Sequence, residues 1–292
     1  MACYHPAPAV RLQNGDVRFI SSSVVDAESF KLPCGQCVGC RLEYSRQWAI
    51  RCLDEAQMHS ENSFITLTNS EDSVSKFGRS LDVGVFQKFM KRFRKEVAPH
   101  RIRFFHCGEY TQKFFPHYHA LIFGWAFPDR YYWSMNKAGT HKLFRSPQLE
   151  RLWPYGFSYV GDVSFESAAY VARYVMKKVV CDRDDLDRLI MKDTGEILKP
   201  EYVTMSRRPG IGTSWYKKYR EDVYPLGNRV IRGRDMRPPK FYDSLYAVDD
   251  PFGFEDLQFL RQNSLDKSDN TMQRLGVKEK VTMARLKLFP RE

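Results

Sequence analysis

The sequence predicts an α+β fold, and three patterns of residues support this prediction. Two β-rich runs, at 101–110 and 117–123, are separated by a short segment, which is typical of a β-hairpin. A further β-rich run, FITLT, covers 64–68. Amphipathic helical patterns begin at Asp82 and after Ser164. Helices that separate strands of this kind indicate a domain in which helices pack on a sheet.

The amino-terminal third is expected to hold a cysteine knuckle that leads into a helix. Residues 1–33 show little periodicity, and the knuckle CGQCVGC follows them at 34–40. Apolar side chains recur at helical spacing over 45–60. A second helix is expected from Asp82, which is a suitable N-cap, to Pro99, which stops it.

The rest of the chain is expected to contain further elements in the same style. Residues 125–141 form an aromatic insertion punctuated by glycine and proline. Ser146-Pro147 is typical of a helix start, and residues 157–163 are expected to form a strand. The run FESAAYVARYVMKKVV at 165–180 predicts a strong helix. The predicted organisation is a cysteine-rich segment with its helix (1–60), a central domain (61–180) and a basic, partly helical carboxy-terminal extension (181–292).

The charge balance indicates a polyanionic partner. The chain has 46 Lys and Arg against 35 Asp and Glu, a formal net charge of +11, and 43% hydrophobic residues. This composition excludes a disordered or fibrous protein. No apolar run reaches the ~20 residues of a membrane span, and the start MACYHPAPAV lacks a secretory leader, so we expect a cytosolic protein. The excess of cations favours a nucleic-acid partner over a merely solvated basic surface.

Two basic segments could supply phosphate contacts. Residues 76–103 contain nine Lys and Arg against two acids, and residues 207–240 contain ten against three. Arg229, Arg232, Arg234 and Arg237 either line a DNA groove or form a solvated arm. The aromatic insertion could stack unpaired bases, although hydrophobic packing explains any single one of its aromatic residues equally well.

The cysteines favour thiols or metal ligands over disulfides. There are seven of them, an odd and clustered set. Cys34, Cys37 and Cys40 supply three thiolates within seven residues. Candidates for the fourth ligand of a structural Zn²⁺ are Cys3, His5 and Cys52. Such an ion would pin the amino terminus to the rest of the protein, and the alternative is a reduced, metal-free turn.

The sequence Pro116-His117-Tyr118-His119 is a candidate site for a divalent cation. Residues i and i+2 of a strand share one face, ~6.6 Å apart, so both imidazoles could bind one ion while the tyrosine between them points the other way. The predicted hairpin lays Glu109 across from one of the histidines, which would complete the site with a carboxylate. Histidines that act only as hydrogen-bonded spacers are the simpler alternative.

A second constellation lies on the helix at 165–180. Tyr170, Tyr174 and Lys177 are expected on one polar face, opposite an apolar stripe that includes Ala168 and Ala172. A phenol has an ordinary pKa near 10, so a neighbouring ammonium group would favour the nucleophilic phenolate. Tyrosine attack on a phosphodiester, assisted by a histidine-bound Mg²⁺ or Mn²⁺, fits these residues. A covalent phosphotyrosine would preserve the energy of the bond, so a strand could be nicked and later rejoined.

Three stretches, FITLTN, GEYTQKFFPHYHALIF and AAYVARYVMKK, closely resemble the ordered motifs of HUH-type rolling-circle replication initiators. The resemblance is strongest to the initiators of microviruses, especially the gokushovirus branch, and extends to the cysteine-rich start and to MSRRPGIG at 205–212. It implies a central antiparallel sheet with flanking helices, and an HUH endonuclease domain at 61–180. It maps the metal ligands to His117 and His119, with Glu109 as the third, and the nucleophiles to Tyr170 and Tyr174, with Lys177 as the accompanying lysine.

The same resemblance implies an origin-specific nick in circular phage DNA, a 5′-phosphotyrosyl link and a 3′-hydroxyl primer. It implies single-stranded origin DNA and host helicase and polymerase as partners, in the cytoplasm of the host bacterium. It leaves open which tyrosine attacks first and which divalent metal is used. The rival hypothesis from another class is a non-catalytic, zinc-stabilised nucleic-acid-binding protein, for which the basic segments and the cysteines would suffice.

Overall fold

The computed structural model describes residues 3–21, 29–111, 113–136, 139–177, 189–191, 193–231, 233–264 and 268–288. By its internal contacts the chain divides into two compact units. The sheet unit comprises residues 46–254, and the terminal unit comprises residues 1–45 and 255–292. Helices α1 (Val38–Gln57) and α9 (Pro251–Asn263) each run from one unit into the other.

The sheet unit is built on a seven-stranded sheet in the order β10-β5-β6-β4-β9-β8-β7. Every neighbouring pair in it is antiparallel. Its strands are β4 (Asn62–Asn69), β5 (Arg103–Tyr110), β6 (Pro116–Phe123), β7 (Tyr131–Met135), β8 (Lys142–Arg145), β9 (Gly156–Gly161) and β10 (Tyr202–Met205). The expected α+β fold with a central antiparallel sheet is confirmed.

The helices of the sheet unit begin where the sequence provides caps. α3 (Val83–Glu96) starts after Asp82, whose side chain accepts a hydrogen bond from the Gly84 amide. α4 (Pro147–Leu152) starts after Ser146 in the same way, with proline in its first turn. The remaining helices of this unit are α2 (Glu71–Phe77), α5 (Phe165–Lys177), α7 (Thr213–Val223) and α8 (Lys240–Asp249). Strands β11 (Arg229–Ile231) and β12 (Arg234–Met236) form a separate small hairpin.

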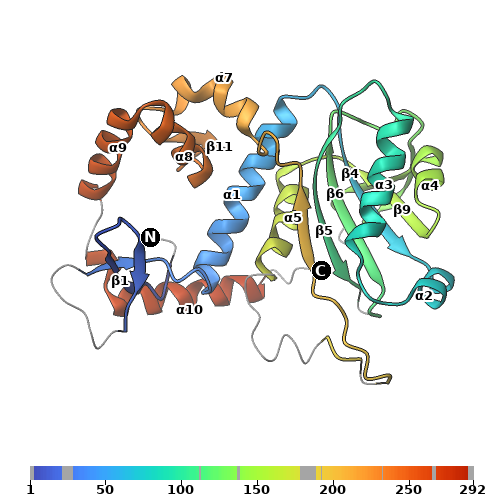
Figure 1. The fold of residues 1–292 in the computed structure, drawn as a ribbon, viewed down its shortest axis with the longest axis horizontal. Coiled ribbons are helices and arrows are strands. Elements are labelled where there is room, and N and C mark those ends of the chain that lie inside the picture. The colour runs from blue at the N-terminus through green and yellow to red at the C-terminus, as the bar shows by residue number, and fades with distance from the viewer. Residues whose placement is uncertain are drawn as a thin grey trace. The chain divides into compact units, whose positions relative to one another are not determined.

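Hydrophobic cores lie on both faces of the central sheet. One contains Ile65, Tyr118 and Ile122 from the strands, packed with the apolar faces of α3 and α4. The other contains Leu121 and Phe123, packed with α5 and the later part of α1. Figure 1 shows α3 and α4 on one side of the sheet and α5 on the other. Because alternate residues of a strand face opposite sides, β6 contributes to both cores.

A buried polar cluster connects α1 to the hairpin and to α8 within this unit. Asp54 is fully buried and pairs with Arg229, at 2.6 Å between Oδ2 and Nη1. The hydroxyl of Tyr242 donates to the same carboxylate at 2.8 Å. Arg229 therefore stabilises the fold from an enclosed position, which is neither of the two roles that we expected for it; Arg232 lies outside the described residues.

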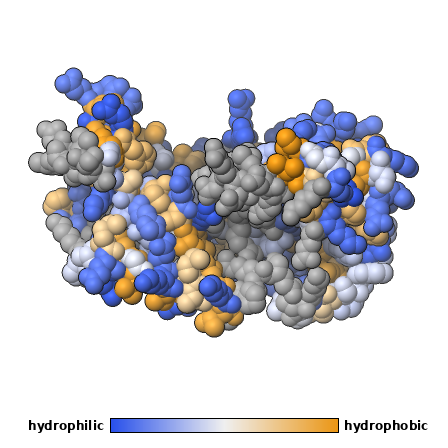
Figure 2. All heavy atoms as spheres, turned by 90° about the horizontal axis from the view of Figure 1, so that it is seen from below, coloured by the Kyte–Doolittle hydropathy of each residue, from blue (hydrophilic) through white to orange (hydrophobic). Residues whose placement is uncertain are grey.

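The terminal unit is assembled from both ends of the chain. Its small antiparallel sheet has the order β2-β1-β3, with β1 (Ala7–Arg11), β2 (Val17–Phe19) and β3 (Phe30–Leu32). The carboxy-terminal part adds a 3₁₀ turn, η2 (Ser268–Asn270), and helix α10 (Met272–Leu288). Val277, Val281 and Met283 of α10 remain exposed. On the face seen in Figure 2, hydrophobic residues lie in small groups separated by hydrophilic ones.

Sequence patterns located most local elements but missed several strands. The predicted strands at 64–68 and 157–163, the hairpin at 101–123 and the helix after Asp82 are confirmed within a few residues. The expectation that residues 1–33 lack regular structure was wrong, and the aromatic insertion contains β7. β10 was also missed, because its partner β5 lies about a hundred residues earlier and short strands carry little signal of their own. The three-part division of the chain stays a prediction.

Candidate active site

The hairpin β5–β6 determines which side chains meet on one face of the sheet. Its register places Glu109 opposite His117, and Cys107 opposite His119. Alternation then directs the two histidines and Glu109 to the α5 side, while Tyr118 enters the core on the opposite side. Both Glu109 and His119 are buried, with 6% and 5% of their surface exposed.

Glu109, His117 and His119 form a compact group of potential metal ligands. One ligand atom from each lies within 4.8 Å of the others. Nε2 of His119 is 2.8 Å from Oε1 of Glu109, and the two imidazole centroids are 4.5 Å apart. Carboxylate oxygen and imidazole nitrogen are ligands that divalent metals commonly use. The donor set and its spacing therefore fit a single cation.

The neighbouring strand β4 contributes two threonines that orient the histidines. The register pairs Thr66 with His119 and Thr68 with His117. Oγ1 of Thr66 lies 3.0 Å from Nδ1 of His119, and Oγ1 of Thr68 lies 2.8 Å from Nδ1 of His117. When each Nδ1–H donates to its hydroxyl, Nε2 of each imidazole carries the free lone pair that a metal needs.

We identified FITLTN as a strand but did not predict this contact. The available signal was the alternation Thr66-x-Thr68, which has the same spacing as His117-x-His119. Spacing alone does not show that two strands are neighbours or in which register they pair. Only the ladder between β4 and β6 brings the two patterns together.

Tyr170 of α5 lies directly beside the ligand group. Its hydroxyl donates to Oε1 of Glu109 at 3.2 Å and is 3.4 Å from Nε2 of His119. Its ring meets the imidazole of His119 edge-on, with centroids 4.9 Å apart, and Phe64 stacks on the same imidazole at 5.5 Å. Tyr170 is half-buried against the sheet, whereas the helical pattern had assigned it to a polar face away from the core.

The other two predicted residues of α5 are only partly accessible to description. Tyr174 and Lys177 belong to the helix, but their side chains lie outside the described part of the structure. Ala168, Val171 and Ala172 are the buried residues that hold the preceding two turns against the sheet. Val171 was absent from the predicted stripe, because the buried arc of the helix is rotated relative to the simple pattern.

Burial determines the protonation state of His117. It lowers the pKa of this imidazole to about 3, and the nearby His119 lowers it further while Glu109 opposes the shift. His117 is therefore neutral at neutral pH and can act as a ligand without first losing a proton. His106, on the other face of the sheet, has its pKa lowered well below the usual value by complete burial, and its Nδ1 lies 3.0 Å from the hydroxyl of Thr204.

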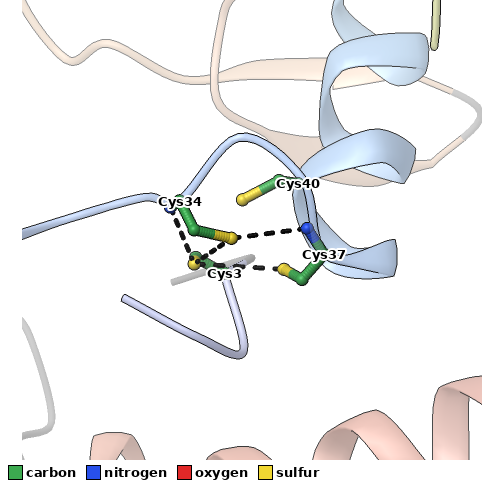
Figure 3. Close-up of side chains that lie close together, drawn as sticks. All are labelled: Cys3, Cys34, Cys37 and Cys40. Atoms are coloured by element: carbon green, nitrogen blue, oxygen red, sulfur yellow. Dashed lines mark hydrogen bonds between the residues drawn. The ribbon is translucent and has the colours of Figure 1, made fainter. Parts of the chain in front are cut away.

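The cysteines of the terminal unit form a second group of potential ligands. Cys3, Cys34, Cys37 and Cys40 have their sulfur atoms within 4.8 Å of one another (Figure 3). Cys3 is thus the candidate that joins the knuckle. The other candidates for fourth ligand lie elsewhere: His5 contacts Glu279 and Cys52 lies in the core of the sheet unit.

Two other predicted features also receive a position. In the aromatic insertion, Tyr131, Tyr132 and Trp133 are exposed on β7, whereas Trp125 packs against a core. The turn PGIG precedes α7 and is bound to α1, since the Gly212 amide donates to Oε2 of Glu55 at 2.7 Å. No helix in the described ranges has the length and apolar character needed to cross a membrane.

Comparison with known proteins defines the class to which this fold and site belong, the replication-associated proteins. The family model of the replication-associated protein ORF2 matches residues 62–179, which run from the start of β4 to just beyond α5. The chain belongs to this family, together with replication-associated proteins of microvirus-like single-stranded DNA phages. No solved structure matches.

Three relatives document the extent of the similarity. Replication-associated protein VP4 of Bdellovibrio phage phiMH2K is 29% identical over 266 residues, covering 86% of this chain and 79% of the relative. Replication-associated protein ORF2 of Spiroplasma virus 4 is 30% identical, with 83% and 79% covered. Replication-associated protein ORF4 of Chlamydia phage 1 is 34% identical, with 84% and 61% covered. These matches extend well beyond the part that the family model covers.

Proposed function

We propose that this protein is a replication initiator that nicks single-stranded origin DNA and later rejoins it by tyrosine chemistry. The observation that carries the proposal is the position of the Tyr170 hydroxyl, beside both Glu109 and His119, in a chain of the replication-associated family. The net charge of +11 supports a nucleic-acid substrate.

Glu109, His117 and His119 would hold one Mg²⁺ or Mn²⁺. Their ligand atoms lie close enough together for one ion, and both imidazoles have Nδ1 engaged by a threonine hydroxyl. When bound, the cation would polarise a non-bridging phosphate oxygen and offset the charge that develops there. The two threonines act as positioning residues, because they orient the imidazoles without touching the substrate.

Tyr170 would be a nucleophile. Its Oη forms a bond to phosphorus, the bond from phosphorus to the 3′ oxygen breaks, and the released 3′ oxygen takes up a proton as a hydroxyl. The phenolic proton points toward Glu109 in the structure, which gives it an acceptor before attack. The product is a 5′-phosphotyrosyl protein, which a later 3′-hydroxyl can reverse and thereby rejoin the strand.

Tyr174 and Lys177 complete this proposal from the sequence. One helical turn separates Tyr170 from Tyr174, so a second phenol would permit a second transfer before the first is released. Lys177 would favour the phenolate through its positive charge. A free 3′-hydroxyl suits a polymerase primer, and host helicase and polymerase in the host cytoplasm are the partners that this function requires.

The test is the formation of a covalent adduct. The protein is incubated with Mn²⁺ and overlapping single-stranded oligonucleotides that tile the genome encoding it. We expect one oligonucleotide to give an SDS-stable adduct, lost when Tyr170 and Tyr174 both become phenylalanine. Tyr118→Phe is the matched control, because Tyr118 lies between the histidines but points to the other face.

The outcome also decides against the rival function. A non-catalytic nucleic-acid-binding protein would retard the oligonucleotides without forming any adduct. Binding without an adduct across the whole set would overturn the proposal. An adduct that persists in the double phenylalanine variant would show that another residue is the nucleophile.

A further inference from the structure

We propose that Cys3, Cys34, Cys37 and Cys40 bind one structural Zn²⁺ that fastens the amino-terminal segment beside α10. The four sulfur atoms converge from two separate stretches of chain, as Figure 3 shows, and lie within 4.8 Å of one another. This site is independent of the sheet residues to which the proposed nuclease function is assigned.

The distances between sulfur atoms match a single tetrahedral ion. A Zn–S bond of about 2.3 Å places tetrahedral sulfur atoms about 3.8 Å apart. Sγ of Cys3 lies 3.6 Å from Sγ of Cys34 and 3.9 Å from Sγ of Cys37. A disulfide needs about 2.05 Å, so these cysteines are not oxidised pairs. The spacing also disfavours an iron–sulfur cluster, in which several metal atoms hold the cysteine sulfurs apart.

Backbone amides around the cluster are arranged to stabilise thiolates. The amides of Cys34, Cys37 and Tyr4 donate to sulfur atoms of the group, at 3.2, 3.3 and 3.3 Å. Gly35 has a positive φ of 76°, which allows the tight turn between the first two knuckle cysteines. Cys40 lies in the first turn of α1, where the helix dipole also favours negative charge.

The strand pairing of the terminal unit explains why Cys3 is the fourth ligand. β1 and β3 pair with Ala7 opposite Leu32. Cys3 precedes the first of these positions by four residues, and Cys34 follows the second by two. The antiparallel ladder thus brings the start of the chain to the same end as the knuckle.

The residues after Cys3 carry the effect of the ion to α10. The hydroxyl of Tyr4 lies 2.8 Å from that of Thr282, and Nε2 of His5 lies 2.8 Å from Oε2 of Glu279. Both contacts join the amino-terminal segment to the carboxy-terminal helix, within one unit. A metal bound to Cys3 would therefore fix the first and last parts of this unit together.

The terminal unit has few hydrophobic residues that could do the same. Both hydrophobic core clusters lie within the sheet unit. The buried hydrophobic residues among the described part of the terminal unit are Cys3, Ala9, Leu257 and Leu275. Small folds with so little core commonly depend on a metal or on disulfides. Metal binding would thus supply stability that packing does not.

The first experiment measures bound metal in the full-length protein, purified under reducing conditions and freed of loose ions by gel filtration. Mass spectrometry of the metals should find about one zinc per chain. Cys3→Ser and Cys37→Ser should each lose it. Cys52→Ala is the matched control and should retain it, because Cys52 is a buried cysteine outside the cluster.

A second comparison separates this site from the proposed active site. A His117→Ala and His119→Ala double variant should keep its zinc, even though it loses the proposed catalytic ligands. Zinc that disappears from this variant but persists in Cys3→Ser would overturn the assignment. Absence of zinc from the wild-type protein, or iron in its place, would overturn it as well.

The third measurement does not depend on variants that fold poorly. Zinc is removed from the wild-type protein with a chelator, and hydrogen exchange is followed by mass spectrometry. Amides of β1 and α10 should exchange at least ~10-fold faster, while those of β4, β5 and β6 keep their protection. Co²⁺ added to the stripped protein should restore protection and give the absorption bands of a tetrathiolate site. Unchanged exchange after complete zinc removal would overturn the structural role.

Discussion

The hydroxyl of Thr66 offers a specific test of how the sheet prepares its candidate metal site. The hydroxyl lies 3.0 Å from Nδ1 of His119, an imidazole with only 5% of its surface exposed. Thr66→Val keeps the shape and the β-branched side chain but removes this hydrogen-bond partner. Because little water can reach the imidazole, Nδ1 loses its partner without a replacement.

The expected loss follows from two independent magnitudes. A buried polar group without a partner costs about 1–3 kcal/mol. Removing a partner that orients a metal-binding histidine typically weakens metal affinity about 10–100-fold, equivalent to about 1.4–2.8 kcal/mol. Both ranges lead to the same expectation, a Kd for Mn²⁺ that rises about 10–100-fold in Thr66→Val. Thr66→Ser retains a hydroxyl and should bind Mn²⁺ nearly as tightly as the wild type.

Isothermal titration of the full chain with Mn²⁺ measures this Kd directly. The matched control is Thr204→Val, which removes the same kind of contact, at 3.0 Å, from Nδ1 of His106 on the other face of the sheet. It should leave the Kd within about twofold. Our reasoning fails if Thr66→Val binds Mn²⁺ like the wild type, or if both valine variants weaken binding equally.

Three further predictions concern catalysis, folding and pH. Tyr170→Phe should lower the rate of adduct formation at least ~100-fold while keeping Mn²⁺ binding, and an equal loss of both would indicate misfolding. Arg229→Met leaves the carboxylate of Asp54 buried without its cation, so the free energy of unfolding in urea should fall by about 3–5 kcal/mol. Adding Asp54→Asn to that variant should recover part of the loss, and no recovery would contradict the ion-pair explanation. Burial lowers the pKa of His106, so the unfolded chain takes up a proton below pH ~6.5 that the folded protein refuses, and stability decreases as the pH falls. This histidine accounts for about 2 kcal/mol between pH 7 and pH 5, and His106→Phe should reduce the measured change by that amount; equal changes in both proteins would refute it.

Local patterns were sufficient where a few neighbouring residues decide the structure. The α3 helix could be located from Asp82 and from the spacing of Phe86, Phe89 and Phe93, because a cap and an apolar stripe both act within the helix. The hairpin β5–β6 could be located in the same way, since a short connection leaves its two strands no other convenient partner.

Long-range pairing was beyond the reach of such patterns. Thr66 and His119 are 53 residues apart, and their contact depends on the register between β4 and β6. Tyr170 was assigned to a polar helix face, yet its phenol reaches the sheet because α5 packs with a buried arc that includes Val171. The side-chain identities were in the sequence, but their distances were not.

The sequence by itself determined the kinds of element, the basic character of the protein and the residue types from which two metal sites can be built. Only the tertiary structure decided which of these residues meet: Cys3 rather than His5 or Cys52 with the knuckle, and Thr66 and Thr68 with the histidines. The physical reason is that side-chain chemistry and short-range periodicity are local properties. Strand register and helix packing instead result from the burial of surfaces that are distant in the chain.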